Sequence, residues 1–262
     1  MISSWTVDHA GGYTDGQLDQ LSRIVRTVGL AIKSGRNQRM ASTLLEVYLG
    51  KDAGRRVLSG EIECGMVQSI SAVLWYRDLQ GFTKIADATP SDELIKLLND
   101  YFENMVEPIH AAGGQVLKFM GDGLMAIFEL DNADNADICR LALDTVEETQ
   151  RRVAEVNAER AAAGQPTTEF NVAMHLGEVQ YGNIGTKDRL DFTVVGPAGN
   201  EVSWIEAMCR PLGQDVIVSS AFSTAAANCQ DRLVSLGRYP LGNARAPEEL
   251  FTLMPPEATE KD

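Results

Sequence analysis

Residues 76–83 read Tyr76-Arg77-Asp78-Leu79-Gln80-Gly81-Phe82-Thr83, and they follow directly on the apolar run Ile70-Ser71-Ala72-Val73-Leu74-Trp75-Tyr76. An apolar run of this length, bounded by turn residues, is typical of a buried strand. The strand ends at the aspartate, and the glycine-led turn after it offers backbone N–H groups ahead of a helix. A turn of that kind can cradle phosphate, so we expect an anion-binding loop beside a carboxylate.

A second aspartate occupies a comparable place in Lys118-Phe119-Met120-Gly121-Asp122-Gly123. This segment joins two strand-like runs, 116–120 and 124–128, through a Gly-Asp-Gly turn typical of a tight hairpin. An Asp-Gly pair after a strand is more often an ordinary turn. A strand and a neighbouring hairpin can nevertheless bring both carboxylates over one cleft, where they would share hard cations.

The surrounding pattern predicts an α+β fold. Residues 89–92, Thr-Pro-Ser-Asp, favour a helix start with Thr89 as N-cap and proline in the first turn, and Gly113-Gly114 favours its end. The apolar positions between recur at helical spacing. A second helix is expected from about 135 to 163, and a strand over 169–176. Together with the strands above, this order is a ferredoxin-like βαββαβ arrangement.

Composition excludes several classes of protein. The 262 residues include 37 acidic and 23 basic ones, and the net charge of −14 disfavours nucleic acid and anionic membranes as partners. No apolar run reaches the roughly 18 residues of a membrane helix, and no signal peptide opens the chain, so we expect a soluble, cytoplasmic protein. The scattered cysteines and histidines indicate neither a disulfide framework nor a zinc site.

The two aspartate segments resemble signatures of the class III adenylate and guanylate cyclases. Residues 76–83 are similar to that family's F-x-D-I-x-G-F-T motif, 118–122 to its K-x-x-G-D hairpin, and 189–196 to its base-binding strand. The resemblance extends over about residues 68–254 and implies the class III cyclase fold. A diguanylate cyclase is disfavoured because its G-G-[DE]-E-F hairpin is absent.

The resemblance implies adenylate cyclase activity, in which ATP yields 3′,5′-cyclic AMP and pyrophosphate through two Mg²⁺ or Mn²⁺ ions. Asp78, Asp122 and the Leu79 carbonyl would bind the metal, and Gly81-Phe82-Thr83 would bind phosphate. Other positions matched to the family are the adenine-reading Lys118 and Thr193, the ribose-orienting Asn200, and the triphosphate-binding Arg245. Lysine at position 118 suits adenine because guanine presents an N–H there, which lysine cannot accept.

Two positions depart from the family pattern V-N-x-A-x-R. Gly199 stands where valine is usual, and Trp204 stands where the family has its transition-state arginine. Indole carries no positive charge, so turnover should be weak or absent unless another group compensates. Arg210 is six residues beyond, about 240° around a continuous helix, and is expected to point elsewhere. The alternative reading is therefore a cyclase-homology module that binds nucleotide or pairs with another cyclase chain.

The remaining expectations concern organisation. Residues 1–40 form a helical segment that resembles the last strand and helix of a GAF-like sensor domain, and 41–67 form a helical linker broken by Gly50 and Gly54. Residues 255–262 are expected to be a disordered tail. Residues 177–185 resemble the turn that precedes the base-binding strand, and His175 is expected to be a hydrogen-bonded strand residue.

In the family the metal and base residues come from opposite chains, which implies a homodimer and an inactive monomer.

Overall fold

A computed structural model describes residues 4–6, 8, 11–130, 135–242 and 246–254 of the chain. They fall into two compact units, Met1–Gly60 and Glu61–Asp262. The predicted tail, 255–262, and Arg245 lie outside the described residues. In the described part of the chain, every helix is too short or too polar to cross a lipid bilayer.

The first unit consists of two helices, α1 (Asp15–Leu49) and α2 (Lys51–Leu58). A reciprocal cap starts α1, in which the Thr14 hydroxyl accepts from the Gln17 N–H and the Gln17 side chain accepts from the Thr14 N–H. The helix continues across residues 40 and 41 and ends at Gly50, whose φ is +86°. The strand implied by the GAF-like resemblance is absent among the described residues before Thr14, and the sensor origin of this segment remains a prediction.

The expected break at Gly54 was wrong, because this glycine lies buried inside α2. A Cβ at position 54 would lie 3.0 Å from the backbone of Leu45 and Glu46. The glycine therefore lets α2 pack closely against α1 and does not interrupt it.

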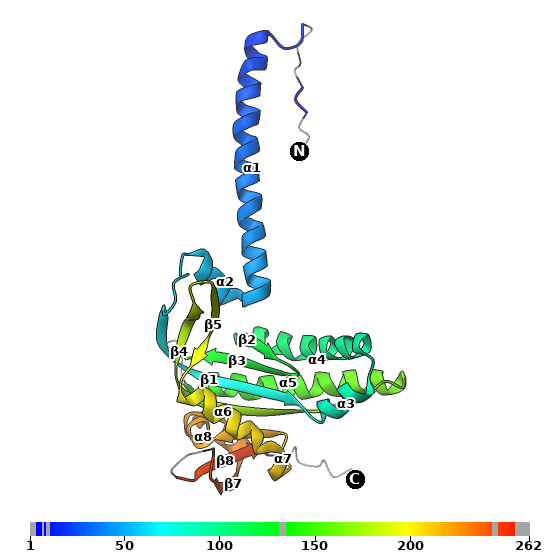
Figure 1. Cartoon of the computed structure of the whole chain (residues 1–262), viewed down its shortest axis with the longest axis vertical. Helices are drawn as coiled ribbons and strands as arrows, with labels where there is room; N and C mark the ends of the chain where they lie inside the picture. Colours follow the sequence, from blue (N-terminus) through cyan, green and yellow to red (C-terminus); the bar gives the residue numbers. More distant parts are fainter. Residues whose placement is uncertain (1–3, 7, 9–10, 131–134, 243–245, 255–262) are drawn as a thin grey trace. The chain divides into compact units, whose positions relative to one another are not determined.

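The second unit is built on an eight-stranded sheet with the order β2-β3-β1-β4-β6-β8-β7, and β5 pairs with β4 beside this path (Figure 1). Four of these strands, β4-β1-β3-β2, are antiparallel neighbours. The strands are β1 (Val67–Leu79), β2 (Gln115–Met120), β3 (Gly123–Glu129), β4 (Phe170–Thr186), β5 (Arg189–Val195), β6 (Val216–Ser219), β7 (Leu233–Tyr239) and β8 (Glu248–Leu253).

Chain order and sheet order together confirm the ferredoxin-like core. The sequence runs β1, α4, β2, β3, α5, β4, which is the predicted βαββαβ order. The helices of this unit are α3 (Phe82–Ala88), α4 (Ser91–Ala111), α5 (Asn135–Ala162), α6 (Pro197–Ala207), α7 (Cys209–Leu212), α8 (Ser220–Ala225) and the 3₁₀ turn η1 (Ala227–Arg232).

Strand β1 has a helical layer on each face. Its side chains alternate, and Val73, Trp75 and Leu79 join the buried core formed with α4 and α5. Ala72 and Leu74 are buried on the opposite face, where α6 contacts β1 and β4. Figure 1 shows α4 and α5 running along the sheet, with α6 on its other side. The middle of β1 is therefore buried on both faces, and its final residues, Asp78 and Leu79, line a cavity.

Two predicted local features differ from the structure. Pro90, not Thr89, is the N-cap of α4, and no side chain caps that helix. The strand predicted over 169–176 continues to Thr186, so 177–185 is strand and not turn. The pairing of β4 with β1 along its length explains the extension, because Val67–Leu79 supplies a partner for every residue from Phe170 to Gly182.

A substitution at Gly114, between α4 and β2, tests the core packing. A Cβ there would lie 2.7 Å from the Phe128 ring and 2.8 Å from Ile109, so Gly114→Ala should lower the free energy of unfolding by about 1–3 kcal/mol. The matched control is Gly199→Ala in α6, where no described atom lies within 4 Å of the added Cβ. The control should be neutral or stabilising by up to about 1 kcal/mol. Chemical denaturation measures both, and equal stabilities would contradict this packing.

Candidate active site

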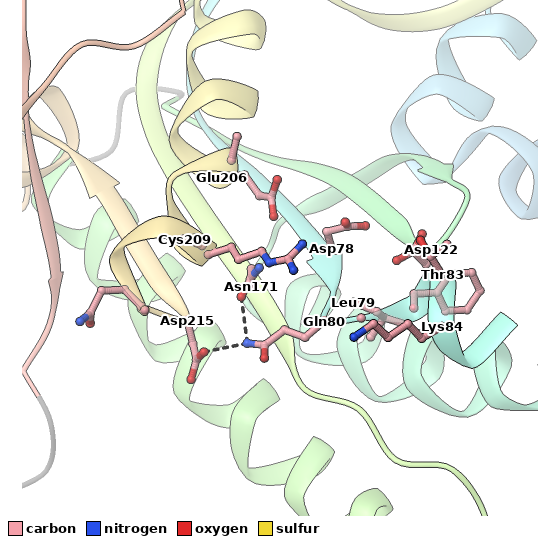
Figure 2. A pocket seen from close by; sticks show the side chains of 16 residues that line it. Asp78, Leu79, Gln80, Thr83, Lys84, Asp122, Asn171, Glu206, Cys209 and Asp215 are labelled. Atoms are coloured by element: carbon pink, nitrogen blue, oxygen red, sulfur yellow. Dashed lines mark hydrogen bonds between the residues drawn. The ribbon is translucent and has the colours of Figure 1, made fainter. Parts of the chain in front are cut away.

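Asp78 and Asp122 lie together because of how β1 and β3 pair. Arg77 pairs with Leu124 across these strands, while Met120 pairs with Gly123 and leaves Gly121 and Asp122 as the loop of the β2–β3 hairpin. The hairpin tip therefore reaches the end of β1. Both aspartates line one cavity of about 640 Å³ (Figure 2).

The two carboxyl groups affect each other strongly. Burial and the neighbouring Asp122, which shares a side-chain hydrogen bond with Asp78, raise the pKa of Asp78 to about 7. Two carboxyl groups in contact are not both ionised unless a cation lies between them, and without one they share a proton. Without bound metal, the pair is therefore expected to retain a proton near neutral pH.

The donor set suits a hard divalent cation. Both aspartates supply oxygen, and Leu79, whose carbonyl is the third predicted ligand, lines the same cavity. Among the described residues no three His, Cys, Asp or Glu side chains form a closed metal site. A cation here would take its other ligands from water or phosphate, as Mg²⁺ commonly does.

The predicted phosphate loop opens onto the same cavity. Gly81, Phe82 and Thr83 line it, and Gly81 adopts the left-handed conformation with φ +67° at the start of α3. Lys84 follows on the same wall and adds a positive charge. The structure thus brings the metal candidates and the phosphate candidates together.

Sequence analysis missed several polar residues of this cavity. The Gln80 amide donates to Asn171, at 2.9 Å, and to Asp215, at 2.7 Å, and so links the ends of β1, β4 and β6. Glu206 at the end of α6 is a further acid, and burial raises its pKa. Asn171 of β4 pairs with Asp78 of β1, and this register is visible only once the two strands are paired in the structure.

The expectation that Arg210 points away was wrong. Helix α6 ends at Ala207, and the short α7 begins at Cys209, so the 100° step of a continuous helix does not extend to Arg210. Arg210 lines the cavity with Asp78 and Asp122. No hydrogen bond or ion pair involves its side chain within the described part of the chain, so its charge is available to a ligand.

Trp204 does not line this cavity. Its indole lies so close to Gly242 that a Cβ on that glycine would overlap the ring. Trp204 instead borders a separate space of about 80 Å³ together with His175, Glu201 and Glu248. The tryptophan therefore packs against the segment that follows β7.

His175 is hydrogen-bonded, as predicted. Its Nδ1 lies 2.9 Å from the Ser219 hydroxyl, and its Nε2 lies 3.0 Å from Glu201. Burial is the main cause of its lowered pKa. The ring joins β4, β6 and α6, which favours a structural role.

The candidates for binding the base and the ribose lie outside the acidic cavity. Lys118 is half-buried on β2, Thr193 is buried on β5, and Asn200 is exposed on α6. The Thr193 hydroxyl has no hydrogen-bond partner among the described residues. Strands β2 and β5 contact each other, so Lys118 and Thr193 belong to neighbouring elements. Within one chain, the metal candidates and the base candidates are separated.

Comparison with known proteins identifies the family. The family model for the adenylate and guanylate cyclase catalytic domain matches residues 66–254, and the chain belongs to this family. An adenylate cyclase of Anabaena cylindrica is 30% identical over 164 residues, 61% of this chain and 32% of that protein. Adenylate cyclase 1 of Rhizobium meliloti is 31% identical over 182 residues, 68% of this chain and 26% of that protein.

Solved structures show the same fold. A bacterial light-regulated adenylyl cyclase superposes with a TM-score of 0.71 at 21% identity, covering 88% of this chain and 64% of that one. The chain spans about a third or less of the two cyclases named above. The class III cyclase fold is thus confirmed, and what the chain acts on must be argued from its own site.

The acidic pair predicts a pH dependence of stability. Between about pH 4 and pH 7, the folded Asp78 keeps a proton that the unfolded chain, with an ordinary pKa near 3.8, has released. The free energy of unfolding of the metal-free protein should therefore fall as pH rises through this window. Asp78→Asn should flatten the fall and stabilise the protein at pH 8 by about 1 kcal/mol or more.

Urea denaturation between pH 4 and pH 8 measures this dependence. Asp191→Asn, at an exposed position on β5, is the matched control and should keep the wild-type slope. An Asp78→Asn curve parallel to the wild type would show that the two carboxyl groups are not coupled.

Proposed function

We propose that this chain is an adenylate cyclase domain that converts ATP into 3′,5′-cyclic AMP and pyrophosphate. The contact between Asp78 and Asp122, in a cavity large enough for a triphosphate, carries the proposal. Two divalent ions, Mg²⁺ or Mn²⁺, would acidify the ribose 3′-hydroxyl and neutralise the leaving phosphates when bound. The bond from O3′ to the α-phosphorus would form as the bond from that phosphorus to the α–β bridging oxygen breaks, with pyrophosphate as the leaving group and the hydroxyl proton released to solvent.

The chain's own residues would position the substrate. Asp78, Asp122 and the Leu79 carbonyl would hold the cations, and the backbone of Gly81-Phe82-Thr83 would bind phosphate oxygens. Such a reaction depends on alignment and charge stabilisation more than on covalent chemistry. Arg210 and Lys84, both on the cavity wall, supply positive charge from the same chain.

Preference for adenine is proposed from Lys118. An ammonium can donate to N1 of adenine but cannot accept the N1–H of guanine. The unpartnered Thr193 hydroxyl is suited to the amino edge of the same base. Lys118→Glu should therefore reduce use of ATP relative to GTP.

The separation of the two residue sets supports a homodimer. Neither Lys118, Thr193 nor Asn200 lines the cavity of Asp78. A second copy of the chain can present its base-reading side chains to that cavity, and two-fold symmetry then creates two equivalent sites. A monomer would lack a complete site.

Trp204 supports a second candidate, a module that binds nucleotide without turnover. Its indole carries no charge, so this position of α6 offers no cation to the α-phosphate in either site of a dimer. Loss of a transition-state arginine in phosphoryl transfer costs roughly 10³ to 10⁵ in rate. The two candidates differ in whether Arg210 supplies the missing charge.

Turnover with ATP and Mn²⁺ separates these candidates. Chromatography should detect cyclic AMP from the parent protein, and Asp78→Ala or Asp122→Ala should lower kcat by roughly 10³ or more. Mixing Asp78→Ala chains with Asn200→Ala chains should restore activity, because a mixed dimer contains one intact site. A silent parent that still binds ATP, and gains activity with Trp204→Arg, would establish the binding module.

The role of Arg210 gives a separate prediction. Arg210→Ala should lower kcat by roughly 10² to 10³, since it removes a charge that faces the reacting phosphates. Arg238→Ala, at an exposed position on β7 away from the cavity, is the control and should leave kcat unchanged. Equal rates in the two variants would remove Arg210 from the mechanism.

A further inference from the structure

Arg77 is the least expected side chain near the acidic pair. It is fully buried, although it lies in β1 directly beside Asp78. Side chains alternate along a strand, so Arg77 points to the face of Val73 and Trp75, toward α4, while Asp78 opens to the cavity. The guanidinium therefore lies on the face of the sheet opposite the side chain of Asp78, at the ring of Phe102.

No hydrogen bond satisfies this guanidinium. Nε, Nη1 and Nη2 all lack a partner among the described residues. Its charge lies 5.1 Å from the centre of the Phe102 ring, a cation–π contact. Burial of a cation without hydrogen bonds is costly, so a compensating charge is required.

Asp78 and Asp122 are the acids whose charge acts on Arg77. Burial lowers the pKa of Arg77 to about 9, while Asp78 and Asp122 act in the opposite direction. An arginine guanidinium stays protonated in proteins, so Arg77 is a cation. Leu124 pairs with Arg77 across β1 and β3, so the hairpin that carries Asp122 lies beside the backbone of Arg77.

We propose that Arg77 is a built-in counter-cation of the Asp78–Asp122 pair, which weakens the binding of a free divalent ion and favours a cation that arrives with nucleotide phosphates. The inference depends on the proposed function, because it assumes that the pair binds metal. Arg77 acts through the aspartates and is a positioning residue, not a catalytic one.

Charge explains this discrimination. A free Mn²⁺ or Mg²⁺ ion is repelled by the fixed positive charge at short range and low dielectric. A metal–ATP complex carries net negative charge and is attracted by the same group. Arg77 therefore shifts the occupancy of the cavity from free ions toward metal–nucleotide complexes.

The test measures Mn²⁺ binding by electron paramagnetic resonance in nucleotide-free protein, with no turnover required. Arg77→Met keeps the length and the contact with Phe102 but removes the charge. It should tighten Mn²⁺ binding by about tenfold or more. Arg77→Gln, a second neutral variant, should do the same, whereas Arg77→Lys should retain weak binding.

Arg160→Met is the matched control. Arg160 is also a buried arginine near an aromatic ring, 5.9 Å from the centre of Tyr101, but it pairs with Asp100 away from the cavity. Its replacement should leave Mn²⁺ affinity unchanged. Thermal melts would verify folding, and Mn²⁺ affinities are compared among variants that unfold cooperatively.

The outcomes separate the inference from the proposed function. Unchanged or weaker Mn²⁺ binding in folded Arg77→Met and Arg77→Gln would overturn the role of Arg77. If Asp78→Ala does not reduce Mn²⁺ binding in any background, the metal site itself fails, and the proposed function fails with it. Tighter binding in both neutral variants that depends on Asp78 would establish the counter-cation.

Discussion

The contact between Asp78 and Asp122 is the constraint around which this domain is organised. Two like charges meet because β1 and β3 pair in a register that carries the hairpin tip to the end of β1. Buried residues on both faces of β1 fix that register, since a shift of one residue would move each side chain into the packing of the opposite face. The stability of the sheet therefore maintains an electrostatically unfavourable pair, which suits the metal site that we propose.

Much of this arrangement could be predicted from local sequence. The alternation of apolar runs and turn residues gives β1, the β2–β3 hairpin and the two long helices, and these elements place both aspartates at neighbouring strand ends. Arg210 could not be placed in this way, because helical periodicity fails where α6 gives way to α7 after Ala207. The Gln80, Asn171 and Asp215 cluster depends on pairing between strands far apart in sequence, which local patterns do not report.

The site combines family features with unusual charges. The chain belongs to the adenylate and guanylate cyclase catalytic-domain family, yet its sequence has Trp204 where the family motif predicts the transition-state arginine, and an arginine lies buried beside Asp78. Arg210 lines the cavity, whereas Arg77 is buried in β1 with its guanidinium at the ring of Phe102. The net charge of this chain is −14, so a bound polyanion would depend on local cations such as Arg210 and Lys84 on the cavity wall.

The most direct test of this account is anomalous X-ray scattering from crystals grown with Mn²⁺ and a slowly reacting ATP analogue. The account predicts manganese peaks between the carboxylates of Asp78 and Asp122, with the purine of that nucleotide held by Lys118 of a second copy. Manganese bound elsewhere, or a triphosphate that lies outside the cavity of these two aspartates, would contradict it.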